Sequence, residues 1–180
     1  EPLYWEVEAF SDPRVAAAAE AVQYYFVIFE VLADTRQPDD EFFELMSHFA
    51  TDERVEDTRS WFTGPRSPSP EVYEATGPRW LWIMDVRELP SGDLGATVCI
   101  DAGWYGYHPD GVFRRLTGED HQAWGLSGYV VRQVEEDGGP RWKVDDDVLV
   151  SRMLPEATRE SLRERCIAWA QHEWEANDVN

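Results

Sequence analysis

The sequence predicts an α+β fold, in which a cone-shaped, curved antiparallel sheet wraps around a long N-terminal helix and an extra helix follows at the C-terminus. Two observations lead to this prediction. Apolar residues recur at helical spacing over the first third of the chain and alternate from residue 79 onward. Helices segregated from antiparallel strands along the chain are typical of α+β domains. The first helical segment is apolar on most sides, so a sheet that curls around it would bury it.

The first helix is predicted over residues 12–34, after an arm formed by residues 1–11. Ser11 or Asp12 can cap this helix, and Pro13 suits its first turn. Its polar stripe is narrow, which indicates a helix covered on most sides. Its apolar residues at helical spacing are Val15, Val22, Tyr25, Phe26, Phe29 and Leu32.

Two shorter helices are predicted next, over residues 41–50 and 52–62. Gly64 ends the second of them, and the proline-rich segment "GPRSPSPE" then forms an exposed loop. The buried face of the first of these two helices is predicted to consist of Phe42, Leu45, Met46 and Phe49.

Two β-hairpins and a final helix follow. The turn "PSGD" joins strands over residues 79–89 and 94–107, and the turn "DGGP" joins strands over residues 123–137 and 140–153. The segment "PEATRESLRERCIAWAQHEW" has one apolar stripe, which is typical of an amphipathic helix. The main domain is therefore predicted over residues 12–152, with a C-terminal helix in 153–180 packed on it or beside it.

The charge of the chain narrows the classes of partner. It carries 36 acidic against 16 basic residues, for a net charge of −20. Because nucleic-acid binding needs basic residues that neutralise phosphates, this balance argues against it. The acidity is consistent either with solubility or with a surface that docks on a basic protein. No apolar run is long enough for a transmembrane segment.

Cys99 and Cys166 match neither zinc-ligand nor redox-motif spacing. Both lie in apolar surroundings, so inert buried thiols are the first expectation, and a disulfide between them is the alternative if the protein is exported. The acidic run Asp145 to Asp147 lacks the arrangement of a calcium site, because neighbouring residues in a strand point apart. The sequence therefore predicts no metal site and no cofactor.

Four segments occur in an order that resembles the nuclear transport factor two-like (SnoaL-like) superfamily, and in particular domains of actinobacterial secreted and lipid-anchored proteins. These segments are "VQYYFVIFEVLAD", "LMSHFATDERVEDTRSWF", "ATVCIDAGWYGY" and "GPRWKVDDDVLV". The resemblance covers roughly residues 12 to 152. It implies the cone-shaped fold, a secreted or cell-envelope location rather than a cytoplasmic one, and dimerisation through the outer face of the sheet. The C-terminal helix departs from the usual end of the superfamily after the last strand.

The resemblance also suggests candidate site residues, because enzymes of this superfamily hold an acid or a histidine inside the mouth of the cone. An apolar wall there raises the pKa of a carboxyl group for proton abstraction. The catalytic candidates are Asp85, Asp101, His108 and His121, and the candidates for the wall of a ligand pocket are Tyr25, Trp82, Trp104, Trp124 and Tyr129.

Asp85 also has a purely structural interpretation, and Cys99 lacks what a catalytic cysteine needs. Asp85 can pair with Arg87 or Arg132 across the sheet, and Cys99 has no base beside it in its strand. We therefore favour a non-enzymatic domain that binds a protein partner or a second copy through the sheet face. A small cyclase, dehydratase or isomerase is the first alternative, and an acidic inhibitor or immunity-type protein is the second.

Overall fold

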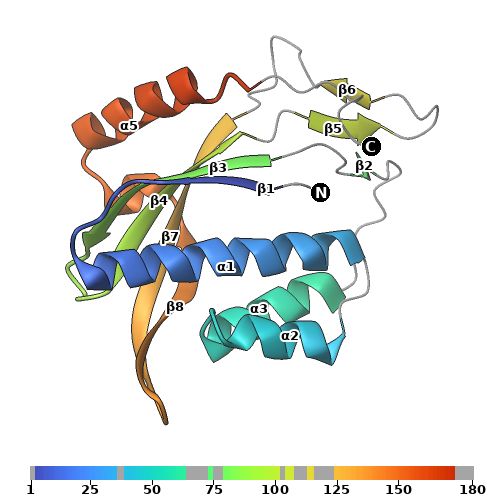
Figure 1. Ribbon diagram of the computed structural model, residues 1–180, viewed down its shortest axis with the longest axis vertical. Coiled ribbons are helices and arrows are strands. Elements are labelled where there is room, and N and C mark those ends of the chain that lie inside the picture. Colours follow the sequence, from blue (N-terminus) through green and yellow to red (C-terminus); the bar gives the residue numbers. More distant parts are fainter. Residues whose placement is uncertain are drawn as a thin grey trace.

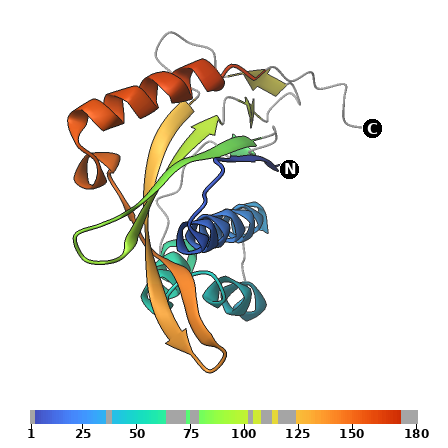
Figure 2. The ribbon, with the colours of Figure 1, turned by 60° about the vertical axis from the view of Figure 1, so that its left-hand side comes forward.

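The computed structural model describes residues 3–35, 39–63, 73–74, 79–101, 104–107, 113–115 and 124–172. It confirms the α+β class: a five-stranded sheet curls into a half-barrel around helix α1 (Pro13–Thr35). Viewed nearly along α1, the sheet curves around the helix, and the C-terminal helix α5 (Glu156–Trp169) lies on the outer side of the curve (Figure 2). We call the face of the sheet toward α1 concave and the face toward α5 convex.

The main sheet has the strand order β1-β3-β4-β7-β8 (Figure 1). Both predicted hairpins are present, β3 with β4 and β7 with β8. Gly92, with φ 89°, makes the first turn, in which the amide of Leu89 bonds the carbonyl of Asp93 at 2.8 Å. The strands are β1 Leu3–Val7, β3 Arg79–Glu88, β4 Leu94–Asp101, β7 Trp124–Glu136 and β8 Gly139–Val148.

Two predictions about the strands were wrong. The arm before α1 forms β1, which pairs in parallel with β3, so the sheet is mixed rather than antiparallel. The strand predicted over residues 94–107 is divided, because β4 ends at Asp101 and the next strand belongs to a second sheet of order β2-β5-β6. That small sheet consists of β2 Tyr73–Glu74, β5 Trp104–Tyr107 and β6 Phe113–Arg115.

Helix α1 packs against the concave face, as predicted. Small side chains along α1 allow it to approach the sheet closely, since Ala18 and Ala19 are fully or almost fully buried. Phe26 is 6% exposed and Phe29 is half-buried, so neither points into solvent. Burial of each large apolar side chain contributes about 1.5–3 kcal/mol. The concave core also contains Val22, Tyr25, Leu81, Ile83, Val98, Val131 and Val144.

Helices α2 (Asp40–Ser47) and α3 (Asp52–Thr63) lie against α1 on a side that the sheet leaves open. Met46 is buried as predicted, but Leu45 is 47% exposed and Phe43 takes the buried position instead. The reason is that α2 is rotated so that Phe43 also lies beneath the guanidinium of Arg59 from α3, 4.1 Å from the ring centroid. A bridge from Ala50 to β8 ties the connection between α2 and α3 to the sheet edge.

The convex face is covered by helices α4 (Val150–Met153) and α5. The strand predicted to run to residue 153 therefore ends at Val148, and the chain turns over the sheet instead. Close packing there depends on glycine, because a Cβ atom on Gly128 would lie 2.6 Å from Cε of Met153. The predicted dimer face is thus largely occupied by the chain's own C-terminal helices. None of the helices in the described part of the chain has the length and apolar character needed to cross a membrane.

A disulfide joins Cys99 of β4 to Cys166 of α5, with 5.6 Å between their Cα atoms. Both residues are 0% exposed. Cys99 is buried as predicted, but the expectation of free thiols was wrong and the disulfide alternative is correct. The bond forms because Cys99 faces the convex side, where α5 presents Cys166 from its buried stripe.

Candidate functional site

Asp85 and Asp101, the two acids predicted for the cone mouth, lie on the convex face. Side chains alternate along a strand, so Asp101 shares the face of Cys99, and Asp85 lies opposite Thr97 on that same face. Asp85 forms a two-bond ion pair with Arg87, at 2.7 and 2.9 Å, which is the structural alternative anticipated from the sequence. Neither acid is therefore placed to act inside the cone.

Asp101 does have a histidine partner, although not a predicted one. Its carboxylate is 1% exposed and lies 3.0 Å from Nδ1 of His172, just beyond α5, and 3.4 Å from the amide nitrogen of the same residue. The imidazole stacks on Trp80 at 4.7 Å between ring centroids, and Trp169 meets its edge. The interpretation of His172 as a surface or boundary residue agrees with its half-buried side chain, but the sequence did not reveal that His172 pairs with Asp101 and attaches the C-terminal end of α5 to the sheet.

Of the remaining predicted residues, those whose side chains the structure describes are divided between the two faces of the sheet. Tyr25 and Tyr129 belong to the concave core, whereas Trp82 lies on the convex face beneath Trp169. His108 and His121 are outside the described residues. Trp104 and Trp124 begin β5 and β7, and their side chains are also outside the described part.

Aromatic side chains pack against one another inside the described part of the cone. The rings of Tyr25, Phe26 and Tyr129 contact one another at centroid distances of 5.2–6.4 Å. Burial raises the pKa of Tyr129 and that of Tyr25, so both phenols stay neutral. Among the described residues, Asp101 is the only buried carboxylate, it lies on the convex face, and no histidine is buried. The described part of the interior therefore holds no acid–base pair of the kind that the sequence suggested.

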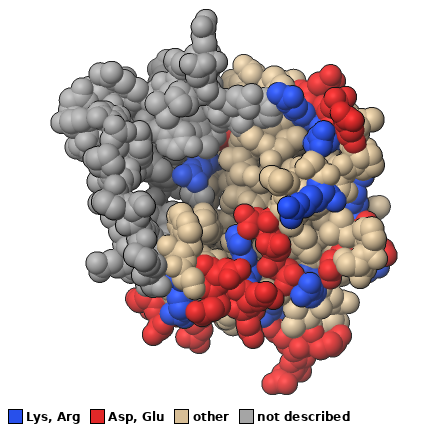
Figure 3. Space-filling view, turned by 180° about the vertical axis from the view of Figure 1, so that it is seen from behind, with Lys and Arg blue, Asp and Glu red and all other residues tan. Residues whose placement is uncertain are grey.

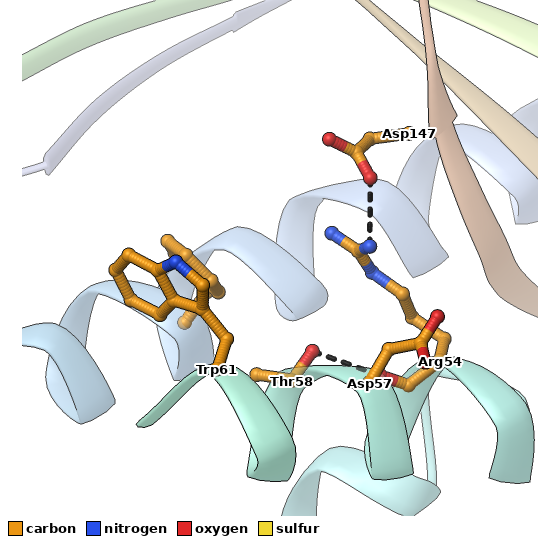
Figure 4. Close-up of a pocket in the computed structure, with 6 residues that line it drawn as sticks. Arg54, Asp57, Thr58, Trp61 and Asp147 are labelled. Atoms are coloured by element: carbon orange, nitrogen blue, oxygen red, sulfur yellow. Dashed lines mark hydrogen bonds and ion pairs between the residues drawn. The ribbon is translucent and has the colours of Figure 1, made fainter. Parts of the chain in front are cut away.

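The candidate site lies at the rim of the cone, where α1, α3 and the end of β8 meet. A cavity of about 300 Å³, here called the rim cavity, opens between them (Figure 4). Most of its wall comes from one face of α3, because residues three and four apart on a helix are neighbours. The lining residues are Phe29, Arg54, Asp57, Thr58, Trp61 and Asp147.

Arg54 organises the floor of the rim cavity. Its Nε donates to the hydroxyl of Tyr25 at 2.9 Å. Its Nη1 donates to Asp147 at 2.7 Å, as Figure 4 shows. Burial by itself lowers the pKa of Arg54, but the Tyr25 oxygen and the Asp147 carboxylate more than offset burial and raise it. The guanidinium is therefore charged and held in one orientation, with its side chain 16% exposed.

A second cavity of about 330 Å³, here called the strand-end cavity, shares Asp147 with the rim cavity. It also includes Tyr129, Leu149 and Arg152. Leu149, at 66%, and Trp61, at 63%, are the most exposed large apolar side chains in the described part of the chain. Asp147 therefore lines two cavities, each of which also includes one of these exposed apolar side chains. We call Asp57, Trp61, Asp147 and Leu149 together the rim surface.

The surroundings of the rim surface are acidic. Figure 3 shows the molecule from the side opposite to Figure 1. Asp and Glu side chains gather there over the lower half of the molecule, where α3 and the β7–β8 hairpin lie. Asp57 has no ion pair with any residue that the structure describes, and the side chain of Asp147 is 60% exposed despite its bond to Arg54. The rim surface is therefore suited to a cationic group next to apolar contacts.

Sequence reasoning overlooked Arg54 and Trp61, and it considered Asp147 only as part of an acidic run that lacks the arrangement of a calcium site. One signal was available: Arg54, Thr58 and Trp61 follow each other at four- and three-residue spacing, so they share a face of their helix. The partner of that face was not visible, because Asp147 is 93 residues away from Arg54 in the chain.

Comparison with known proteins does not assign this chain to a family. No protein-family model matches the sequence, and no curated protein matches it at a significant level. The resemblance to the nuclear transport factor two-like superfamily therefore rests on the order of the sequence segments.

Proposed function

We propose that this chain is a non-enzymatic domain of the nuclear transport factor two-like type, which binds a basic protein partner in the cell envelope or outside the cell. The observation that carries the proposal is the contrast between the aromatic packing inside the described part of the cone and the exposed groups at its rim. The interior offers aromatic packing, whereas the rim surface presents two exposed apolar groups, Trp61 and Leu149, beside the carboxylates of Asp57 and Asp147. Exposed apolar groups with polar neighbours are typical of protein interaction sites.

Charge favours a basic partner over a second copy. Two copies, each with a net charge of −20, repel each other, whereas a basic surface is attracted to both carboxylates of the rim. The convex face, which the superfamily uses for dimerisation, is largely covered by α4 and α5 in this chain. A heteromeric complex is therefore the better supported arrangement.

The disulfide supports a location outside the reducing cytosol. Disulfides persist mainly in oxidising compartments, and the bond between Cys99 and Cys166 is fully buried. This supports the secreted or envelope location over the intracellular setting of the inhibitor alternative.

The enzyme alternative has one observation in its favour, the buried pair of Asp101 and His172. An aspartate that orients a histidine is a common element of catalytic sites. However, Trp80 covers one face of the imidazole by stacking, and neither member of the pair lines the rim cavity or the strand-end cavity. We therefore assign the pair to attachment of α5.

Carbodiimide cross-linking tests the proposal directly, because it joins a carboxylate to a primary amine within contact distance. Lys143, the only lysine of the chain, is 6% exposed and forms an ion pair with Glu136. Apart from the α-amino group, this chain therefore has almost no amine of its own to react. Cross-linked products with envelope or secreted proteins of the source organism will report amines of the partner.

We expect a specific adduct that maps to Asp57 or Asp147 and declines as salt is added, because salt screens charges beyond about 10 Å at 0.1 M. The rim variant Asp57→Asn/Leu149→Ser should lose the adduct. The matched control Asp137→Asn/Ile167→Ser removes one acid and one exposed aliphatic group elsewhere and should keep it. No specific adduct, or equal loss in both variants, would contradict the proposal.

A further inference from the structure

We propose that the rim cavity receives one arginine side chain of the partner, stacked on Trp61 and paired with Asp57 and Asp147. This inference rests on the proposed function and names the chemical group that the rim recognises. It follows from the shape of the cavity, from the charges around it and from the exposed indole.

The size of the cavity fits a side chain. About 300 Å³ lies at the lower end of the range for small-ligand pockets. Phe29 lies beside Trp61, with ring centroids 6.3 Å apart and planes inclined by 28°, so an aromatic wall lines one side. Trp61 remains 63% exposed. Tryptophan is the best aromatic partner for a cation, and the planar guanidinium of arginine stacks on aromatic rings as lysine does not.

The carboxylates are placed to complete such a site. Asp57 precedes Trp61 by one helical turn on α3, so the two side chains are neighbours on the same face of the helix. Asp147 faces them from β8; one of its oxygens bonds Arg54, and its other oxygen points away from that bond (Figure 4). A guanidinium has donors in a planar fork, so it can bond a carboxylate while its face lies on an indole.

The charge of Arg54 does not reverse this preference. Two of its donor groups are occupied by Tyr25 and Asp147, and its side chain is only 16% exposed. Two carboxylates thus face one guanidinium that is already paired, in a protein with a net charge of −20. An anionic ligand bonded to the remaining Nη2 of Arg54 is the competing possibility, and the experiment includes it.

The test is an NMR titration of the ¹⁵N-labelled protein at low salt with N-acetyl-arginine amide. Two reference probes accompany it: N-acetyl-citrulline amide, which has the same shape without the charge, and acetate, which tests the anion. The indole signal of Trp61 is assigned from the Trp61→Phe variant. We expect the arginine probe to shift this signal and the α3 amides at millimolar concentration, with citrulline and acetate binding more weakly.

Three variants then locate the site. Trp61→Ala and Asp57→Asn should each weaken binding of the arginine probe about two- to fivefold, as expected for exposed cation–π and ion-pair contacts. Glu53→Gln removes an exposed acid from the same helix without touching the cavity lining, so it should leave binding unchanged. Because all three altered side chains are exposed, the variants should fold, and their amide spectra will verify this.

The inference is overturned if the arginine probe leaves the Trp61 signal unshifted, if citrulline or acetate binds as strongly, or if Glu53→Gln weakens binding as much as Asp57→Asn. These failures are distinct from failure of the proposed function. A carbodiimide adduct that maps to the rim together with a negative titration would retain the protein-binding role and reject the arginine pocket.

Discussion

Loss of the disulfide between Cys99 and Cys166 should cost this protein a large part of its stability. The two cysteines are 67 residues apart, and cross-linking them restricts the unfolded chain. Loop-closure entropy for that separation corresponds to about 4 kcal/mol at room temperature. Since domains are typically stable by only about 5–15 kcal/mol, the disulfide accounts for a substantial share of the total.

The assay is equilibrium unfolding in urea, with tryptophan fluorescence as the readout. It compares oxidised protein with protein that was unfolded, reduced and then refolded in reductant. Reduction has to be carried out on the unfolded chain, because both cysteines are 0% exposed in the native state. We expect the free energy of unfolding to fall by about 4 kcal/mol on reduction. The free energy of unfolding of the variant Cys99→Ala/Cys166→Ala should be lower by slightly more than this, because the variant also loses two buried sulfur atoms.

Hydrogen exchange provides a second measurement with a local readout. Apart from Cys166, α5 buries only Leu162 within its own bounds, with Trp169 half-buried, so the helix depends strongly on its covalent link to β4. Amides of α5 should therefore exchange faster after reduction, while those of β4 and β7 keep more protection. If the reduced protein is within about 1 kcal/mol of the oxidised one, or if α5 is as protected as before, the assigned role of the disulfide is wrong.

Three further predictions concern single groups. Burial raises the pKa of Tyr129, so the phenol of the unfolded chain loses its proton at a lower pH than that of the folded protein. The stabilisation from Tyr129 should therefore be complete below about pH 10 and decline above it. Ultraviolet absorbance that shows Tyr129 ionising without unfolding would contradict this. His172→Ala removes a bond to the buried carboxylate of Asp101 and should lower the free energy of unfolding in urea by about 1–3 kcal/mol. An unchanged urea midpoint of unfolding would contradict this. Gly128→Ala should lower the melting temperature, because the Cβ atom of the alanine would meet Met153 and the neighbouring strand backbone. A melting temperature equal to that of the wild type would refute the close packing at this position.

The local elements could be predicted from the sequence, because their signals are local. The periodicity around Tyr25 and Phe26 determined the long helix and its buried face. The turn containing Gly92 and the turn before Gly139 determined both hairpins, where positive φ angles favour glycine. These features depend on residues close together in the chain, so sequence spacing is sufficient to find them.

The tertiary structure decided which side chains of the strands lie on each face of the sheet. The segment "WLWIMDV" is apolar on both sides because α1 covers one face of the sheet and α5 covers the other. Alternation alone therefore could not show which side Asp85 occupied, and an irregularity between Ile83 and Asp85 shifts the register as well. The parallel pairing of β1 was equally hidden, because backbone hydrogen bonds at a sheet edge leave little trace in side-chain pattern.

The candidate site is determined almost entirely by tertiary contacts. The sequence by itself supplied the acidic charge that favours a basic partner, and it supplied the two cysteines. The fold decided that Cys99 meets Cys166, that Asp101 meets His172 and that Asp147 meets Arg54, across 67, 71 and 93 residues. Each pair joins residues of different elements that only the completed fold brings together, so no spacing along the chain encodes them.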